Sequence, residues 1–451
     1  MICQGCRSGS STVKTNDDST AMVKLITLDP GHFHAALVQK SMSAGIDSVV
    51  QVYAPAGPEL DAHLALISQY NHRAEAPTHW VEQVHTGGDF LDKMIADLKG
   101  NVVVLAGNNL RKTQYITRSV EAGLNVLGDK PMAINRDNFL ALEKDFALAQ
   151  QKHVLLYDIM TERSEITNQL QQALSNLPEV FGKRDTGTVT SPSVTIESVH
   201  YFYKFVSGNA LTRPAWFFDP AQQGEAIADV GTHLVDLVQW ACFPGVVLDY
   251  KRDIRISQAR TWTTPITRSQ FSAVTKNDSF PGFLRPYVRK DTILDTHANG
   301  EISYMLRGVH VKLTARWEYQ APEGSGDTHY CLMKGSLASL EIRQGAGESY
   351  KPTLFIWPVY SNSAYDSALQ KGMASINARF PGVTLEKSGK GWKLDIPEKY
   401  KVGHEAHFGQ VMQRFLGYMK TKQLPEWEVP GMVCKYYTTT SALEMAAQKN
   451  K

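Results

Sequence analysis

The sequence contains few cysteines, and they form no recognisable framework. Only five occur among 451 residues, and they are scattered along the chain. This excludes a dense disulfide scaffold and offers no second cysteine pair or nearby histidine set for zinc. Cys3 and Cys6 form a single C-x-x-C pair, but no strand precedes it, which argues against a redox motif. We therefore expect neither structural disulfides nor a bound metal ion.

The sequence also lacks long apolar runs and an excess of charge of one sign. No apolar segment reaches 18 residues, so no internal membrane-spanning helix is expected. Lys and Arg total 47 against 45 Asp and Glu. No basic stripe is interleaved with aromatic residues, which argues against a nucleic acid partner. Hydrophobic residues make up 43% and charged residues 20%, which is typical of a soluble globular chain, and its length indicates two domains.

Residues 1–22 lack any apolar periodicity and are rich in Ser, Thr and Asp, so we expect a disordered leader. Gly5-Cys6 followed by serines resembles the end of a bacterial lipoprotein signal whose apolar part would precede Met1. Two alternatives stay open. The protein is either exported, as a periplasmic or lipid-anchored protein with a signal truncated before Cys6, or cytoplasmic with an irregular start.

From residue 23 the pattern alternates between short apolar strands and amphipathic helices. Strands are expected at 23–28, 47–54, 80–85, 101–106, 125–127 and 153–157. Helices are expected at 34–44, 59–70, 89–98, 110–122 and 135–151. Such alternation implies parallel pairing through right-handed crossovers. The sequence therefore predicts a Rossmann-type, doubly wound α/β domain over 23–158, with its ligand at the carboxyl ends of the strands.

The second half, 159–451, reads as an α+β domain rich in strands. Strands are expected at 193–205, 251–263, 300–319, 329–343 and 352–359, and helices at 404–421 and 432–447. Two long connections, 264–290 and 361–401, are of the length that carries binding functions or oligomer contacts. We expect His404 and His407, at the start of the first helix, to be caps or surface residues rather than ligands.

The three-glycine loop of dinucleotide-binding folds is missing. The loop after the first strand, 29–35, keeps only Gly31. A tight turn, backbone N–H groups and a helix start can still hold a diphosphate, with His32 and His34 as donors or as surface residues. The second strand ends without an acid or an arginine, so NAD and NADP stay equally open. The expected cofactor-binding residues are Pro30, Gly31, His32, Phe33, His34, Gly107, Asn108, Asn109, Asp129 and Lys130.

Two segments carry chemistry. In Gly128-Asp129-Lys130-Pro131 a lysine follows the end of a parallel strand and precedes a proline of fixed φ. Such a lysine can hold a substrate hydroxyl and stabilise charge on its oxygen, or it is an ordinary surface lysine. In 224–236, a helix would place Asp229 and His233 on one face, with Asp236 three residues further. A histidine beside a carboxylate suits general acid–base work, although a structural contact explains it as well.

Together these segments resemble the motifs of the Gfo/Idh/MocA oxidoreductases, the glucose–fructose oxidoreductase and inositol dehydrogenase type. Gly128-Asp129-Lys130-Pro131 is similar to the family's Glu-Lys-Pro motif, with Asp129 in place of the usual Glu. Residues 229–236 match its D-x-G-x-H-x-x-D motif, and Arg213-Pro214-Ala215-Trp216 fits the pattern upstream. The resemblance runs from about residue 23 to the end of the chain.

The resemblance implies roles for these residues. Lys130 would bind the reacting hydroxyl, His233 would be the general acid and base, and Asp229 would position Lys130 or the substrate. Trp216 and Arg213, which precede the predicted helix, could form a wall of the substrate pocket. The resemblance also implies a large, mainly antiparallel open sheet in the C-terminal domain, used to form dimers or tetramers. The cofactor would be NAD or NADP, which some relatives hold tightly.

The sequence thus predicts an NAD(P)-dependent enzyme of sugar metabolism that transfers hydride at a CH–OH group of a carbohydrate or cyclitol. One alternative uses the same residues: transient oxidation and elimination, which cleaves a glycoside without net redox change. A second alternative is a non-catalytic nucleotide or sugar sensor, which only the reduced glycine loop supports.

Overall fold

The computed structural model describes residues 22–206 and 209–449, so most of the predicted leader lies outside the described residues. The N-terminal half forms a six-stranded parallel sheet of order β3-β2-β1-β4-β5-β6. Its strands are β1 (Leu25–Leu28), β2 (Val49–Ala54), β3 (Val81–Thr86), β4 (Val102–Leu105), β5 (Asn125–Asp129) and β6 (Leu156–Ile159). Its main helices are α2 (Pro58–His72), α3 (Phe90–Asp97), α4 (Lys112–Glu121) and α5 (Arg136–Lys152). This order is that of a Rossmann-type sheet, which confirms the predicted fold class.

The first helix is much shorter than predicted. α1 covers only His34–Leu37, where the apolar spacing predicted a helix over 34–44. Residues 38–45 form turns, bends and irregular backbone instead, and Gly45 adopts a positive φ of 88°. Ser41 and Ser43 lie in this stretch, and serine side chains compete with helical hydrogen bonding. The turn after β1 is therefore followed by a single helical turn rather than a long helix.

The C-terminal half contains a large sheet of order β10-β12-β13-β7-β14-β15-β16-β18-β17, with β11 (Val288–Arg289) paired to β12. Its strands are β7 (Val194–Tyr203), β10 (Ile254–Thr267), β12 (Ile293–Leu306), β13 (Val309–Gln320), β14 (Thr328–Lys334), β15 (Ala338–Gln344), β16 (Thr353–Pro358), β17 (Thr384–Ser388) and β18 (Gly391–Asp395). Strands β7 and β13 pair in parallel, and the other pairs are antiparallel. The predicted mainly antiparallel sheet is thus confirmed.

Two predicted strands are in fact hairpins. The stretch 300–319 contains the end of β12, a turn at Arg307 and Gly308, and β13. The stretch 329–343 contains β14 and β15. The predicted long connections are also wrong, because they hold regular structure. They contain the helices α11 (Arg268–Thr275) and α12 (Ser363–Arg379), the short helix η3 (Gly282–Tyr287) and the strands β17 and β18.

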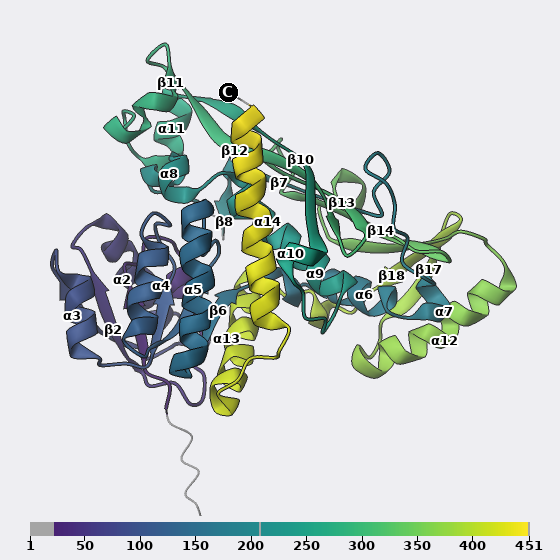
Figure 1. Cartoon of the computed structure of the whole chain (residues 1–451), viewed down its shortest axis with the longest axis horizontal. Coiled ribbons are helices and arrows are strands. Elements are labelled where there is room, and N and C mark those ends of the chain that lie inside the picture. The colour runs from purple at the N-terminus through teal and green to yellow at the C-terminus, as the bar shows by residue number, and fades with distance from the viewer. Residues whose placement is uncertain (1–21, 207–208, 450–451) are drawn as a thin grey trace, which may run out of the picture.

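The last two helices return to the parallel sheet. α13 (His404–Thr421) and α14 (Glu428–Lys449) follow the antiparallel sheet in the sequence, yet Phe408, Phe415 and Tyr436 belong to the N-terminal core. On its other side α14 contributes Cys434 and Ala442 to the C-terminal core. Figure 1 shows α14, in yellow, running between the two halves. The final residues of the chain therefore complete both cores.

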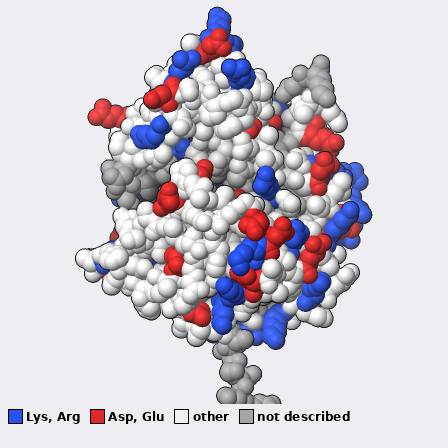
Figure 2. Space-filling view, turned by 90° about the vertical axis from the view of Figure 1, so that its left-hand side faces the viewer, with Lys and Arg blue, Asp and Glu red and all other residues white. Residues whose placement is uncertain are grey.

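The described cysteines, Cys242, Cys331 and Cys434, are free and buried. Among the described helices, none is long and apolar enough to cross a membrane. Figure 2 views the molecule from the left of Figure 1, where acidic and basic side chains are interspersed and large areas carry no charge. The cysteine pair Cys3 and Cys6 lies outside the described residues.

The buried His63 in α2 is expected to make the stability of the protein depend on pH. Its side chain is 4% exposed, and neither ring nitrogen has a partner in the described structure. Burial lowers its pKa to about 4. The unfolded chain therefore takes up a proton below about pH 6.5 that the folded chain refuses, and stability falls as the pH drops from 6.5 towards 4. We expect His63→Leu to be more stable than the wild type at neutral pH, because it removes two unpaired buried nitrogens.

The advantage of His63→Leu should grow below pH 6.5 by up to about 1.4 kcal/mol per pH unit. Urea unfolding at several pH values measures this difference. His72→Leu, at an exposed position of the same helix, is the control and should show no growing advantage. Parallel pH dependences of His63→Leu and the wild type would contradict the prediction.

Candidate active site

The candidate site lies where β1, β4 and β5 end and the helix α9 (Ala226–Cys242) begins. β1 and β4 are neighbours at which the strand order reverses, and ligands of such sheets bind in the crevice at this point. Asp129 is the last residue of β5 and Lys130 follows it directly. α9 brings the motif residues Asp229, His233 and Asp236 from the second half of the chain.

Lys130 and Asp229 form a direct ion pair across the two halves. The Lys130 Nζ lies 2.5 Å from the Asp229 Oδ1, and both side chains are largely buried. Burial raises the pKa of Asp229, but the neighbouring Lys130 ammonium outweighs it and holds the pKa below its usual value of 3.8. Asp229 is therefore a carboxylate that fixes the lysine side chain between the sheet and α9.

His233 does not pair with Asp229 in the way its i, i+4 spacing suggested. The Asp229 carboxylate turns to Lys130 instead, and the His233 Nδ1 is buried without a partner in the described structure. Burial, assisted by the positive charge of Lys130, lowers the pKa of His233 well below 6.5. The ring is neutral at neutral pH and is therefore in the form that can accept a proton.

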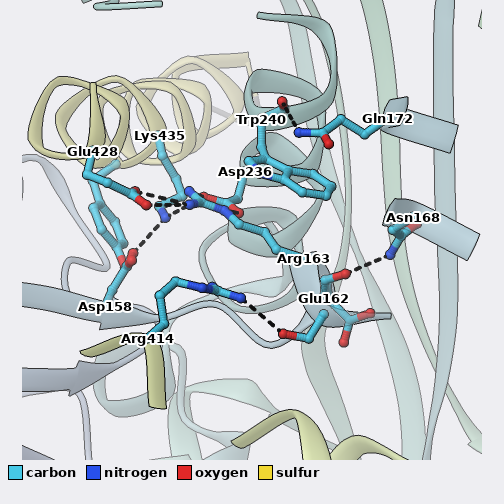
Figure 3. Close-up of polar contacts among 12 residues, drawn as sticks. Asp158, Glu162, Arg163, Asn168, Gln172, Asp236, Trp240, Arg414, Glu428 and Lys435 are labelled. Atoms are coloured by element: carbon cyan, nitrogen blue, oxygen red, sulfur yellow. Dashed lines mark hydrogen bonds and ion pairs between the residues drawn. The ribbon is translucent and has the colours of Figure 1, made fainter. Parts of the chain in front are cut away.

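Asp236, the last residue of the motif, holds α9 to neighbouring elements through buried ion pairs. Its two carboxylate oxygens accept from the Nε and Nη2 of Arg163 at 2.6 Å each, and Lys435 lies 2.8 Å from Oδ1. Glu428 accepts from Arg163 at 3.0 Å, and Asp158 lies 2.6 Å from Lys435. Figure 3 shows this network joining α9, α14 and the short helix η1 (Glu162–Ser164). The network fixes α9 and therefore the direction in which His233 points.

Two backbone N–H groups of the loop after β1 are hydrogen-bonded to the neighbouring loop after β4. The backbone N–H groups of Gly31 and His32 both donate to the carbonyl of Ala106, at 3.2 and 3.1 Å. At Gly107 a Cβ atom would lie 2.3 Å from the carbonyl oxygen of Asp29, so only glycine permits this approach. Gly107 thus lets the loops after β1 and β4 pack closely, and the N–H groups of Gly31 and His32, two of the expected diphosphate donors, already have a partner.

The histidines of this loop face Asp129. His34 Nδ1 lies 2.9 Å from Asp129 Oδ2, and His32 Nδ1 lies 3.9 Å from the same oxygen. The ring of Phe33 contacts both histidine rings, with centroids 4.6 and 4.5 Å away. Burial lowers the pKa of both histidines well below 6.5. The structure thus brings four of the predicted cofactor residues together, and Pro30 before them is buried.

Asn108 and Asn109 bind the protein itself. The side-chain amide of Asn108 donates to Gln222 Oε1 at 2.7 Å, and that of Asn109 donates to the carbonyl of Gln223 at 2.8 Å. Both glutamines belong to the short helix α8 (Pro220–Gln223). These two predicted cofactor residues therefore hold the β4 loop against the second half of the chain.

Trp216 covers the loop after β1. A Cβ atom on Gly31 would lie 3.3 Å from the Cζ2 of Trp216, which belongs to the short helix η2 (Ala215–Phe218). Arg213, just upstream, is buried between the rings of Phe217 and Trp317 at 4.6 and 4.8 Å. Trp216 thus lies at the site, and Arg213 packs against the neighbouring aromatic rings.

His404 lies at the surface, as the sequence predicted, with 43% of its side chain exposed, although the N-cap of α13 is Gly403. Sequence reasoning did not reveal that its Nε2 lies 3.5 Å from Nε2 of His34. Its Nδ1 lies 4.0 Å from Glu162 Oε1. His407, predicted with it, is buried rather than exposed.

Comparison with known proteins places this geometry in a family. Residues 170–447 match the family described as "Putative oxidoreductase C terminal domain". A structure from Parabacteroides merdae ATCC 43184, described as a "putative oxidoreductase", is 52% identical over 95% of this chain and 98% of its own, with a TM-score of 0.93. No curated protein sequence matches the chain.

Two more distant structures share the fold. GenD2 from gentamicin A biosynthesis, solved in complex with NAD, is 16% identical, with a TM-score of 0.57 over 99% of this chain and 98% of its own. KijD10, a 3-ketoreductase from Actinomadura kijaniata solved with NADP and TDP-benzene, is 13% identical, with a TM-score of 0.54 over 92% and 95%. The family match spans more than half of the chain, and together with the motifs and the 52% identical structure it shows that the chain belongs to the Gfo/Idh/MocA-type oxidoreductases.

Proposed function

We propose that this protein is an NAD(P)-dependent enzyme that transfers hydride between a nicotinamide and a carbinol carbon of a sugar or polyol. One observation carries the proposal. At the carboxyl edge of a Rossmann-type sheet, the Lys130–Asp229 ion pair joins the end of β5 to α9. The same helix carries a neutral His233 that has an unpartnered ring nitrogen. This set can bind a hydroxyl group and take its proton.

The residues fit a nicotinamide dinucleotide at the point where the strand order reverses. Gly107 lets the loops after β1 and β4 pack closely at this point, and a bound nicotinamide would supply the hydride acceptor beside them. The similarity to GenD2 and KijD10, whose structures hold NAD and NADP, supports this choice of cofactor. Because Gly31 and His32 donate to Ala106, we expect this loop to hold a diphosphate with fewer backbone donors than a three-glycine loop.

Within the proposal each side chain has a distinct task. His233 accepts the proton of the substrate hydroxyl, which its depressed pKa allows throughout the neutral range. The Lys130 ammonium binds the same oxygen and stabilises negative charge as the C–H bond breaks. Asp229 holds the lysine in place, and Trp216 forms one wall of the substrate pocket. A polyhydroxy compound suits the site because the reacting group must be a hydroxyl.

The proposal is tested by identifying the nucleotide and the product. Purified protein is heated to release bound nucleotide, which is identified by mass, and a panel of sugars and glycosides is then assayed with and without NAD or NADP. Accumulation of reduced nicotinamide with a keto product supports the proposal. Release of an aglycone without reduced nicotinamide would point to oxidation–elimination instead. A protein that neither retains nor binds either dinucleotide would overturn both.

We also propose that the chain forms a homo-oligomer through its C-terminal sheet. The half-buried polar residues on β12 and β13, such as Glu301 and Lys312, pair across strands at 3.0 Å and form an ordered face. Light scattering after gel filtration measures the assembly directly. A monomer at all concentrations would contradict this expectation.

A further inference from the structure

The ends of β1 and β5 bring together three metal-ligating groups that are far apart in the sequence. His32, His34 and Asp129 each present one ligand atom, and these atoms all lie within 4.8 Å of one another. The part of the chain that the structure describes contains no second group of this kind. Because 95 residues separate His34 from Asp129, spacing along the chain could not reveal the cluster, and the sequence predicted no metal.

The charge balance of the cluster favours a cation. Asp129 is 5% exposed, and within the described residues no Lys or Arg nitrogen lies within 4.0 Å of its carboxylate. The nearby Lys112 donates to the backbone carbonyl of Asp129, at 2.9 Å, and not to its carboxylate. A buried carboxylate is costly unless it is paired or binds a metal. The two imidazoles are the only partners that this carboxylate has in the described structure.

The surroundings resemble the outer shell of a metal site. The second ring nitrogen of His34, Nε2, lies 3.5 Å from Nε2 of His404. The other ring nitrogen of His404, Nδ1, lies 4.0 Å from Glu162 Oε1. A hydrogen bond to the second ring nitrogen fixes the orientation and tautomer of a metal-binding histidine. The rings of Phe33 and Phe408 lie 4.5 and 4.6 Å from the His34 ring and keep the cluster in an apolar setting.

The distances are close to those a small metal ion requires. Ligand atoms at about 2.0–2.1 Å from a tetrahedral zinc ion lie about 3.3 Å from one another. The 2.9 Å between His34 Nδ1 and Asp129 Oδ2 and the 3.9 Å between His32 Nδ1 and that oxygen lie on either side of this value. All three ligand atoms lie within 4.8 Å of one another, and His32 Nδ1 also accepts a hydrogen bond from the backbone N–H of His34 at 3.4 Å, so metal binding requires the His32 ring to shift and give up that bond.

We propose that His32, His34 and Asp129 bind one divalent transition-metal ion at the edge of the candidate active site. Two imidazoles and one carboxylate suit zinc, iron or cobalt better than calcium or magnesium, which prefer oxygen ligands alone. Three protein ligands leave a fourth position open for water or a hydroxyl oxygen. Lys130, which would bind the substrate hydroxyl, follows Asp129 directly in the chain. The metal proposal stands without the proposed redox activity.

The test uses the full-length protein, stripped of metal with a chelator and then dialysed against Co²⁺ or Zn²⁺. Metal content is measured by mass spectrometry, and the visible spectrum of bound Co²⁺ reports its coordination. We expect about one ion per chain in the wild type, and binding weakened by tenfold or more in His34→Ala and Asp129→Asn. His200→Ala is the matched control, because His200 pairs with Asp327 at 3.0 Å but has no third ligand, and its metal content should equal that of the wild type.

The partly exposed His32 provides a variant that is expected to fold even if the buried positions do not tolerate change. Thermal unfolding of each variant checks its folding, and His32→Ala should also bind Co²⁺ more weakly. A wild-type protein that takes up no Co²⁺ or Zn²⁺ overturns the proposal. Stoichiometric binding that His32→Ala keeps unchanged, with the Co²⁺ spectrum of the wild type, overturns it as well. Retained dinucleotide is measured in the same samples, so that failure of the metal site is distinguished from failure of the proposed function.

Discussion

Replacement of Lys130 by methionine is expected to lower turnover by about a hundredfold or more, on the scale of a lost acid–base or charge-stabilising group. Methionine keeps the unbranched apolar part of the side chain but removes the ammonium that would bind the reacting oxygen. The measurement is the rate of nicotinamide reduction in a single turnover, with the substrate found by the sugar panel. Lys204→Met is the control, since Lys204 forms a comparable ion pair with Asp327 at 2.7 Å, and should keep wild-type rates.

Lys130→Met also leaves the Asp229 carboxylate buried without its partner, so folding must be separated from chemistry. The double variant Lys130→Met with Asp229→Asn removes both charges and should recover stability without recovering activity. His233→Ala should lower turnover to a similar extent. Because the pKa of His233 lies well below 6.5, the wild-type rate should not fall as the pH is lowered through 6.5. Rates near the wild type in both single variants would refute the assignment of the site.

Asp236→Ala is expected to destabilise the protein by about 3–5 kcal/mol, the cost of breaking a buried ion pair from one side. The substitution leaves Arg163 and Lys435, which are 6% and 0% exposed, without the carboxylate that they share. Denaturant unfolding measures the loss. Asp295→Ala removes a more exposed ion pair with Arg289 and should cost at most about 1 kcal/mol.

A double-mutant cycle tests whether the destabilisation caused by Asp236→Ala arises from loss of the ion-pair network. Arg163→Met combined with Asp236→Ala should cost clearly less than the sum of the two single variants, because each single variant already loses the ion pair between these two residues. Additive losses, or a loss from Asp236→Ala as small as that from Asp295→Ala, would show that the network does not hold α9 in place.

The parallel half of the fold could be predicted from the sequence because its buried strands are continuous apolar runs between amphipathic helices. The hairpin at Arg307 and Gly308 was missed because alternation of apolar and polar residues continues through so short a turn. The end of α1 was missed because the spacing of apolar residues predicts a longer helix and does not take account of the serines that end it.

The candidate site was predictable only where its residues form local motifs. Lys130, Asp229 and His233 lie in two compact segments, and the chain order of these segments is informative. Arg163 and His404 contact the same region, but they come from segments hundreds of residues away from some of their partners. Contacts between such segments leave no periodicity or spacing in the sequence, so only the folded structure reveals them.

The return of α13 and α14 to the parallel sheet has a consequence for synthesis of the chain. A ribosome delivers the N-terminal strands first, and they are released several hundred residues before Phe408, Phe415 and Tyr436, which fill their core. Until then, the surface that these side chains cover stays exposed, and exposed apolar surface on a partly made chain is prone to aggregate. We therefore expect the parallel half to finish folding only after α13 and α14 are made, and a chain that stops short of these helices would lack part of both cores.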